Sequence, residues 1–185
     1  MGNLCCMDAE LASALTTYAA RWPQEAATVA LFHSLLGDAE NPFQRERLAG
    51  HFTASCWLVS ADGARVLLTH HRKLGLWLQL GGHADGQREL SAAALREAEE
   101  ESGLAGLKIA PEIFDLDRHR IPAHKTVPEH WHYDVRFVVR AGTDEAYTIS
   151  EESLDLAWRD IADLAADPAA DPSVRRMAEK WLARG

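Results

Sequence analysis

The sequence predicts an α+β fold in which helices are layered around a mixed β-sheet. Runs rich in β-branched and aromatic residues, typical of strands, begin at residue 51 and recur up to residue 158. One helical pattern interrupts these runs and two follow them, so strands and helices mix without the regular alternation of a parallel sheet. With 185 residues and 47% hydrophobic content, the chain can form one compact domain with a small appendage.

Two helices are predicted before the sheet, over residues 8–22 and 24–37. Apolar residues recur in both at helical spacing, and Pro23 separates them because proline suits the first turn of a helix. Gly37 suits the end of the second helix. The polar segment 41–47 then leads into the β-rich part. We therefore expect an N-terminal helical extension over residues 1–48 and a main domain over residues 49–185.

The main domain is expected to begin with a hairpin. The runs HFTASCWLVS and RVLLTHH flank the turn Ala61-Asp62-Gly63. The segment KLGLWLQLGG is interpreted as a loop that leads into a helix over residues 90–102, which Gly103 ends. Strands are predicted next over residues 106–121, 130–139 and 154–158, and closing helices over residues 160–166 and 172–184.

Charge and composition limit the partners of the chain. A formal net charge of -9 argues against a nucleic-acid polymer as partner. No apolar run approaches the roughly 20 residues that span a bilayer, and no secretory pattern is present. The three cysteines are an odd number and form no disulfide framework. We expect a cytoplasmic protein that binds a small molecule and no membrane.

The predicted helix over residues 90–102 is strongly acidic on one face. Glu97, Glu100 and Glu101 are spaced i, i+3 and i+4, so their carboxylates share that face and repel one another. A divalent cation would reverse this repulsion, because hard cations prefer carboxylate oxygens. Ala94 and Ala98 form a small-residue stripe that allows close packing on a sheet. From spacing alone, a metal site and a solvated acidic face remain equal alternatives.

This segment resembles the Nudix hydrolase box, G-x5-E-x7-R-E-U-x-E-E-x-G-U, in which U is aliphatic. The resemblance extends over residues 50–165, without the N-terminal helices. Ala98 fills an aliphatic position, whereas Arg88 stands where the box has its first glutamate, with Glu89 beside it. The positions that match the box are Gly82, Arg96, Glu97, Glu100, Glu101, Gly103 and Leu104.

The resemblance implies a Nudix fold, with a mixed sheet between helical layers, and hydrolysis of a nucleoside diphosphate linked to another group. It implies Mg²⁺ or Mn²⁺ held by Glu97, Glu100, Glu101 and the Gly82 carbonyl. Catalytic roles fall to Glu97 and Glu101, with Glu152 as an additional catalytic glutamate. Clustered carboxylates and cations suit this chemistry, because they neutralise a diphosphate and activate water.

Arg88 is the departure that bears most on catalysis. If the first box glutamate is a metal ligand, Arg88 removes a ligand and adds repulsion. If that glutamate mainly pairs with the box arginine, Arg96, then Glu89 could replace it after a small adjustment of the loop. Both alternatives are open at the level of sequence.

A second polar face is predicted in EHWHYDVRF, residues 129–137. Read with a period of two, its aromatic and aliphatic residues share one face, which is an ordinary core face. His130, His132, Asp134 and Arg136 share the other face. These four side chains can bind a metal, a proton or a phosphate.

The histidines resemble in part the metal site of isopentenyl diphosphate isomerases, which share the Nudix fold. His51 starts a matching strand, and His83 stands at the histidine of the isomerase's Cys-Gly-His loop. His130 and His132 replace two metal-binding glutamates of that enzyme. The resemblance implies a second metal site at these four histidines, suited to Zn²⁺, Ni²⁺, Fe²⁺ or Mn²⁺ rather than Mg²⁺. Four unrelated histidines are the alternative.

Hydrolysis is favoured over isomerase chemistry, because Gly81 stands at the catalytic cysteine of the isomerase. An isomerase-like prenyl diphosphate enzyme and a non-hydrolytic module that senses a nucleotide or a metal are the alternatives. The N-terminal extension is expected either to cover the active face or to form a homodimer contact. The cations expected to hold substrate phosphates are Arg72, Lys73, Arg118 and Arg120, with His119 between the last two.

Overall fold

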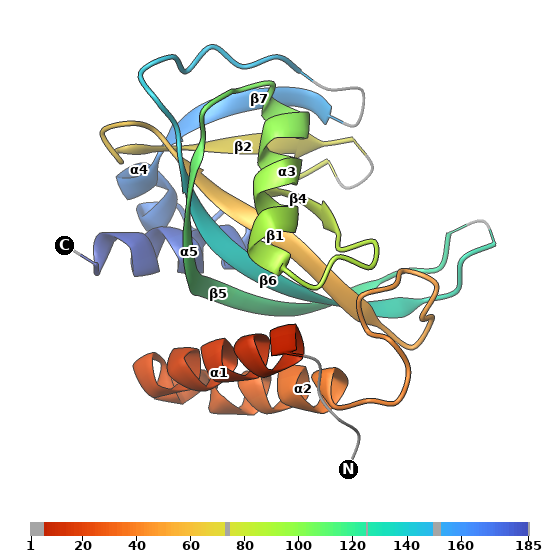
Figure 1. Ribbon diagram of the computed structural model, residues 1–185. Coiled ribbons are helices and arrows are strands. Elements are labelled where there is room, and N and C mark those ends of the chain that lie inside the picture. Colours follow the sequence, from red (N-terminus) through yellow and green to blue (C-terminus); the bar gives the residue numbers. More distant parts are fainter. Residues whose placement is uncertain (1–5, 73–74, 125, 150–152, 185) are drawn as a thin grey trace.

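The computed structural model describes residues 6–72, 75–124, 126–149 and 153–184, and it shows a seven-stranded mixed sheet with helices on both faces (Figure 1). The helices are α1 (Cys6–Arg21), α2 (Ala26–Leu36), α3 (Leu90–Ser102), α4 (Ile161–Ala166) and α5 (Pro172–Leu182), with a 3-10 turn, η1 (Pro23–Glu25), between α1 and α2. The strands are β1 (His51–Val59), β2 (Arg65–His71), β3 (Trp77–Leu78), β4 (Leu80–His83), β5 (Lys108–Ile121), β6 (His130–Arg140) and β7 (Ser153–Asp160).

The sheet is built around β1, which is buried along its whole length. The main path of strands runs β3-β2-β1-β6-β5, while β4 pairs with β1 and β7 pairs with β2. β1 and β6 are parallel, with His51 opposite His132, and the other pairs are antiparallel. This register brings the polar start of β1 beside the polar start of β6.

The two faces of the sheet carry separate cores. On one face α3 packs closely through Ala94 and Ala98, which have no exposed surface. On the other face α4 and α5 cover Trp57 of β1 and Phe114 of β5. Helices therefore flank the mixed sheet on both sides, as predicted.

The N-terminal extension packs on the same face as α3 and shares its core. The ring of Phe32 in α2 lies 5.3 Å from that of Tyr133 in β6, and the ring of Phe43 lies 5.1 Å from that of Phe52 in β1. Figure 1 shows α1 and α2 side by side beneath β5 and β6. The predicted extension is thus present as two helices, while the domain division at residue 48 stays a prediction.

Two strands differ from the prediction. The segment expected as a loop before α3 contains β3 and β4, and β4 pairs with β1 so that Gly81 lies opposite Ser55. Two consecutive glycines have a weak preference for strands, so the local sequence conceals this strand. The pairing with β1 places the glycines against α3.

A helix that spans a bilayer needs about 20 predominantly apolar residues. None of the helices among the described residues is long and apolar enough to cross a membrane.

Candidate functional site

Helix α3 presents the acidic face of the candidate active site. Gly103 ends the helix in the left-handed conformation, with φ of 69°, and its N–H donates to the carbonyl of Glu99. The side chain of Glu97 is 16% exposed, whereas that of Glu100 is 64% exposed. One carboxylate therefore lies against the sheet and another faces solvent.

Two carboxylates of α3 converge on consecutive glycines of β4. The Gly81 N–H donates to Oε1 of Glu101 at 3.0 Å. A Cβ added at Gly82 would lie 2.6 Å from the Glu97 carboxyl carbon, so a side chain at this position would displace that carboxylate. Carboxylate oxygens gathered against a strand backbone are a donor set that suits Mg²⁺ or Mn²⁺. The residues present therefore fit the metal that the box implies.

Arg96 fastens α3 to the loop that precedes it. Its guanidinium donates to the carbonyl of His83 at 3.2 Å, to Oε1 of Gln87 at 3.4 Å and to Oε1 of Glu97 at 3.0 Å. Its Nε also lies 3.9 Å from Oε1 of Glu100. The arginine thus holds the acidic face and the loop in one arrangement.

Arg88 is directed toward the N-terminal extension. It forms an ion pair with Asp8 of α1, and its guanidinium carbon lies 5.1 Å from the centre of the Phe43 ring. Glu89 precedes the first turn of α3, where its carboxylate accepts from the Ser91 hydroxyl at 3.5 Å. Gln87, not Glu89, is therefore the loop side chain that meets the box arginine.

The segment before β1 lies along the loop that joins β4 to α3, which we call the box loop. Arg45 donates twice to the carboxylate of Asp85, each time at 2.6 Å, and the Gly86 N–H donates to the Phe43 carbonyl at 2.8 Å. Asp85 and Gly86 both have positive φ, of 48° and 85°. Because glycine adopts such angles without cost, Gly86 allows the loop to meet this segment.

Five histidines gather where β1, β4, β5 and β6 meet. Ligand nitrogens of His51, His83 and His132 all lie within 4.8 Å of one another. Nε2 of His130 lies 3.2 Å from Nε2 of His132, and the ring of His119 lies 5.5 Å from that of His132. The structure thus brings the four predicted histidines together. It adds His119, which the sequence suggested only as a cation for phosphate.

Burial lowers the pKa of His51, His83 and His132. The pKa of His83 is lowered to about 4, mainly by burial and then by the charge of Arg45. The pKa of His132 is lowered to about 2, mainly by burial and then by the neighbouring histidines. Neutral imidazoles retain the lone pair that a metal requires.

A comparison with known proteins decides the family. The NUDIX domain model matches residues 50–181, well over half of the chain. The chain belongs to the Nudix family. This confirms the resemblance seen in the box, and it identifies the protein as an enzyme of the pyrophosphohydrolase class. A search of curated proteins finds no match.

Solved structures share the Nudix fold. A NUDIX family hydrolase from Clostridium perfringens is 25% identical with a TM-score of 0.56, covering 73% of this chain and 98% of that chain. A C. elegans Ap4A hydrolase is 17% identical with a TM-score of 0.55, covering 72% and 96%. The E. coli dihydroneopterin triphosphate pyrophosphohydrolase is 19% identical with a TM-score of 0.56, covering 72% and 96%. The last two likenesses concern the fold alone.

Beside the histidines, the Nudix domain buries a carboxylate with four hydrogen-bond donors. Asp134 accepts from the hydroxyls of Thr53 and Ser55 at 3.0 and 2.7 Å. It also accepts from the Gln79 amide at 3.3 Å and from Nε of Arg136 at 2.7 Å. The polar face predicted for EHWHYDVRF thus has two parts, a histidine cluster and a buried charge network.

The charge network continues from β6 to α5. Arg136 donates to Asp115 at 3.1 Å, and Arg176 donates to both Asp115 and Asp117. Burial opposes the ionisation of Asp115, yet the charges of Arg176, Arg136 and Lys180 hold its pKa below the ordinary value. Every buried charge here has a partner, so the network contributes structure rather than a reactive group.

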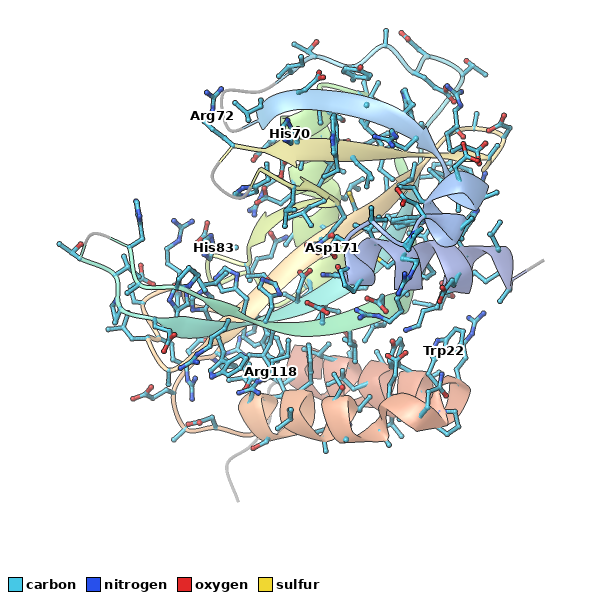
Figure 2. All side chains as sticks on the ribbon, turned by 180° about the vertical axis from the view of Figure 1, so that it is seen from behind. Trp22, His70, Arg72, His83, Arg118 and Asp171 are labelled. Atoms are coloured by element: carbon cyan, nitrogen blue, oxygen red, sulfur yellow. The ribbon has the colours of Figure 1, made fainter. Side chains whose placement is uncertain are left out.

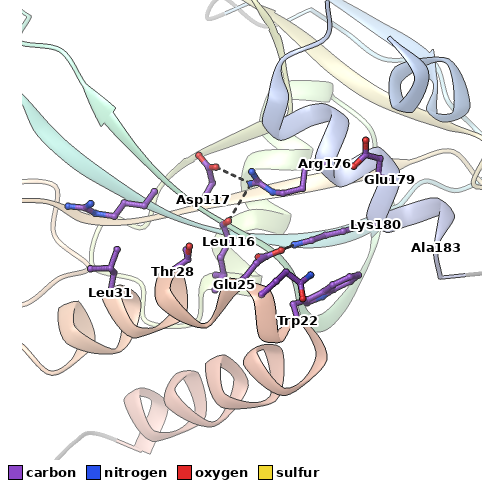
Figure 3. Close-up of a pocket in the computed structure, with 12 residues that line it drawn as sticks. Trp22, Glu25, Thr28, Leu31, Leu116, Asp117, Arg176, Glu179, Lys180 and Ala183 are labelled. Atoms are coloured by element: carbon purple, nitrogen blue, oxygen red, sulfur yellow. Dashed lines mark hydrogen bonds and ion pairs between the residues drawn. The ribbon is translucent and has the colours of Figure 1, made fainter. Parts of the chain in front are cut away.

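A pocket of about 700 Å³ lies where this network meets the N-terminal helices (Figure 3). Lys180 of α5 reaches across it to Oε1 of Glu25 at 2.6 Å and to the Tyr18 hydroxyl at 2.6 Å. None of the box glutamates lines it. The residues that line it are Trp22, Gln24, Glu25, Thr28, Leu31, Leu116, Asp117, Arg118, Arg176, Glu179, Lys180 and Ala183.

The cations predicted to hold phosphates do not gather at one place. Arg118 stacks on Trp131, with its guanidinium carbon 3.6 Å from the ring centre, and Arg120 pairs with Glu129 at 2.5 Å. Figure 2 shows Arg118 on the side of β5 that faces the N-terminal helices, away from His83. Arg72 is exposed in the turn after β2. Lys73 and Glu152 lie outside the described residues, and the binding roles of this set stay predictions.

Proposed function

We propose that this Nudix enzyme cleaves a pyrophosphate linkage in a nucleoside diphosphate linked to another group, with Mg²⁺ or Mn²⁺. The observation that carries the proposal is the convergence of Glu97 and Glu101 on the backbone of Gly82 and Gly81. Glu100 extends the same acidic face toward solvent. A solvated acidic helix has no reason to press its carboxylates against two glycines of a strand.

Each residue has a role in this proposal. Glu97, Glu100, Glu101 and the Gly82 carbonyl would hold the metal, which when bound would neutralise the diphosphate and lower the pKa of water. Glu97 and Glu101 are the candidates to accept a proton from the attacking water. Arg96 is a positioning residue, because it binds the loop carbonyl of His83 and the Glu97 carboxylate together.

The remaining residues of the proposal come from other segments of the sequence than α3. Glu152 precedes β7 and is proposed as an additional catalytic glutamate. Arg72, Lys73, Arg118 and Arg120 are proposed to offset the outer phosphates of a substrate, because the chain as a whole carries a net charge of -9. Nucleotide-derived polyphosphates are the first substrates to test; two neighbours of the same fold are named for Ap4A and for dihydroneopterin triphosphate.

Isomerase chemistry is disfavoured by a steric observation at Gly81. A Cβ at this position would lie 2.2 Å from the Ser55 hydroxyl oxygen. A cysteine therefore does not fit where the isomerase resemblance would require its thiol. A non-hydrolytic module is disfavoured because Arg88, its main support, is directed toward Asp8 and leaves the acidic face intact.

A product screen tests the proposal. The enzyme is incubated with Mg²⁺ or Mn²⁺ and nucleotide sugars, dinucleoside polyphosphates, ADP-ribose, coenzyme A or NADH, and cleavage products are quantified. We expect turnover of at least one substrate and its loss in Glu101→Gln. Glu99→Gln is the matched control, because Glu99 is an exposed glutamate on the same helix. Inactivity on every substrate, or equal turnover in Glu101→Gln, would refute the proposal.

A further inference from the structure

We propose that His51, His83 and His132 bind a transition-metal ion of the Zn²⁺ class at a site separate from the box carboxylates. Their ligand nitrogens lie within 4.8 Å of one another, and the group contains no carboxylate among the described residues. Imidazole nitrogens suit Zn²⁺ and its neighbours, whereas Mg²⁺ prefers oxygen. The donor set therefore separates this site chemically from the glutamates of α3.

Hydrogen bonds to backbone carbonyls fix which nitrogens are available. Nδ1 of His51 lies 3.2 Å from the Arg47 carbonyl, and Nδ1 of His130 lies 2.9 Å from the Pro128 carbonyl. A carbonyl only accepts, so Nδ1 carries a proton in both rings and Nε2 is the nitrogen that a metal can bind. Metal-binding histidines are commonly oriented by such a bond from the other ring nitrogen.

The Nε2 atom of His51 is buried and unpaired within the described part of the chain. His51 is 2% exposed, and its Nε2 has no hydrogen-bond partner among the described residues. Leaving a buried acceptor unpaired costs free energy. A cation bound between His51, His83 and His132 would satisfy this nitrogen.

His130 gives a second indication. Its Nε2 lies 3.2 Å from Nε2 of His132. Two nitrogens bound to tetrahedral Zn²⁺ at about 2.0–2.1 Å lie roughly 3.3 Å apart. The spacing fits a pair of ligands, and it places His130 as the candidate fourth ligand. In the absence of metal, a single proton on His132 would bridge the two rings.

The site is held by the sheet rather than by loops. His51 lies opposite His132 in the parallel pair β1–β6, and His83 lies opposite Thr53 in the pair β1–β4. His119 of β5 lies opposite His132 of β6, and Nδ1 of His119 lies 2.9 Å from an Asp117 carboxylate oxygen. Ligands on adjacent strands lose little freedom when they bind, which favours affinity.

Zinc binding is measured on untagged enzyme that has been stripped of metal and then titrated with Zn²⁺ alone against a chromogenic chelator. We expect one Zn²⁺ per chain, a higher melting temperature when it binds, and no competition from Mg²⁺. Substituting even an outer partner of a metal ligand weakens binding by about 10- to 100-fold, so His51→Gln/His132→Gln should weaken it by more than about 100-fold. His33→Gln/His124→Gln removes two histidines outside the cluster and should bind Zn²⁺ as the wild type does.

Two further measurements distinguish loss of the zinc site from misfolding of a variant and from loss of the proposed hydrolysis. Co²⁺ added to the stripped wild type should give the visible absorption of nitrogen ligation, whatever the variants do. Glu100→Gln/Glu101→Gln should retain Zn²⁺ binding although the proposed hydrolysis is lost. No Zn²⁺ uptake by the wild type, or equal uptake in His51→Gln/His132→Gln, would overturn the site. Loss of Zn²⁺ in the glutamate variant would also overturn it.

Discussion

Arg88 and Asp8, 80 positions apart in the chain, form an ion pair that joins the box loop to α1. Arg88 is the residue that departs from the Nudix box, and the N-terminal extension supplies the carboxylate that neutralises it. The side chains of Arg88 and Asp8 are 33% and 13% exposed, so the pair is half-buried at the junction. The extension therefore accommodates the departure by placing a carboxylate against the positive charge of Arg88.

Exchange of charge between Asp8 and Arg88 tests this relationship. Asp8→Arg and Arg88→Glu should each lower the free energy of unfolding by about 1 kcal/mol or less, because the pair is partly solvated. The double variant should recover most of the loss, since it restores opposite charges. Urea denaturation of all four proteins gives the coupling. Additive losses in the double variant would show that the two residues do not interact.

Gly82→Ala tests the close approach of β4 to α3. The added Cβ would lie 2.6 Å from the Glu97 carboxyl group, so that carboxylate must move. Displacement of a catalytic group by about 1 Å can cost on the order of 10²-fold in rate, and we expect a loss of kcat of that order. Gly142→Ala is the control, because nothing lies within 4 Å of its added Cβ. Equal kcat in the two variants would mean that Glu97 has no part in turnover.

Local pattern was enough to predict the elements that carry the chemistry. The acidic face of α3 follows from the i, i+3, i+4 spacing of Glu97, Glu100 and Glu101. Its end at Gly103 follows from the left-handed conformation that glycine adopts readily. The alternation in β6 likewise predicted that His130 and His132 share a face. Such features depend only on helix and strand periodicity.

Contacts between distant segments could not be predicted from local sequence patterns. β4 was missed because Gly81 and Gly82 favour no strand, and only its pairing with β1 makes it one. Pairing also decides that His119 joins the histidine cluster, since its neighbour His132 lies on another strand. The partner of Arg88 lies in a helix outside the family's segment. Tertiary pairing, rather than local preference, sets all three.

Stability in acid should reflect the buried histidines in metal-free enzyme. An unfolded histidine has a pKa of about 6.5, whereas the pKa of His83 in the fold is lowered to about 4. Between these values the unfolded chain binds more protons, so the free energy of unfolding falls as the pH falls from 6.5 to 4. His132 adds to this loss over the same range, because its pKa is lowered to about 2.

The measurement is urea denaturation in EDTA at several pH values over that range. His83→Gln/His132→Gln should show a smaller loss of stability than the wild type, since two of the groups that take up protons on unfolding are gone. His124→Gln, which changes an exposed histidine, should keep the wild-type dependence. An unchanged dependence in the double variant would mean that other groups cause the acid sensitivity.

Lys180 should be the cation on which the packing of the N-terminal extension depends most. It is 5% exposed, and its Nζ donates to Asp115 at 2.7 Å while also binding Glu25 and the Tyr18 hydroxyl. Lys180→Met leaves Glu25 without a cation, although Asp115 keeps Arg176. Loss of one partner from a buried charge pair costs about 3–5 kcal/mol, and a loss near the lower value is expected.

Arg175→Met is the matched control on the same helix. Arg175 is 39% exposed, and its Nε lies 3.9 Å from Glu179, so its removal should change the free energy of unfolding by less than about 1 kcal/mol. Limited proteolysis should also cut Lys180→Met between α1 and α2 sooner than the wild type, because Tyr18 and Glu25 are released from α5. If the two variants are equally stable and equally resistant to proteolysis, the bonds from Lys180 to the extension do not stabilise the fold.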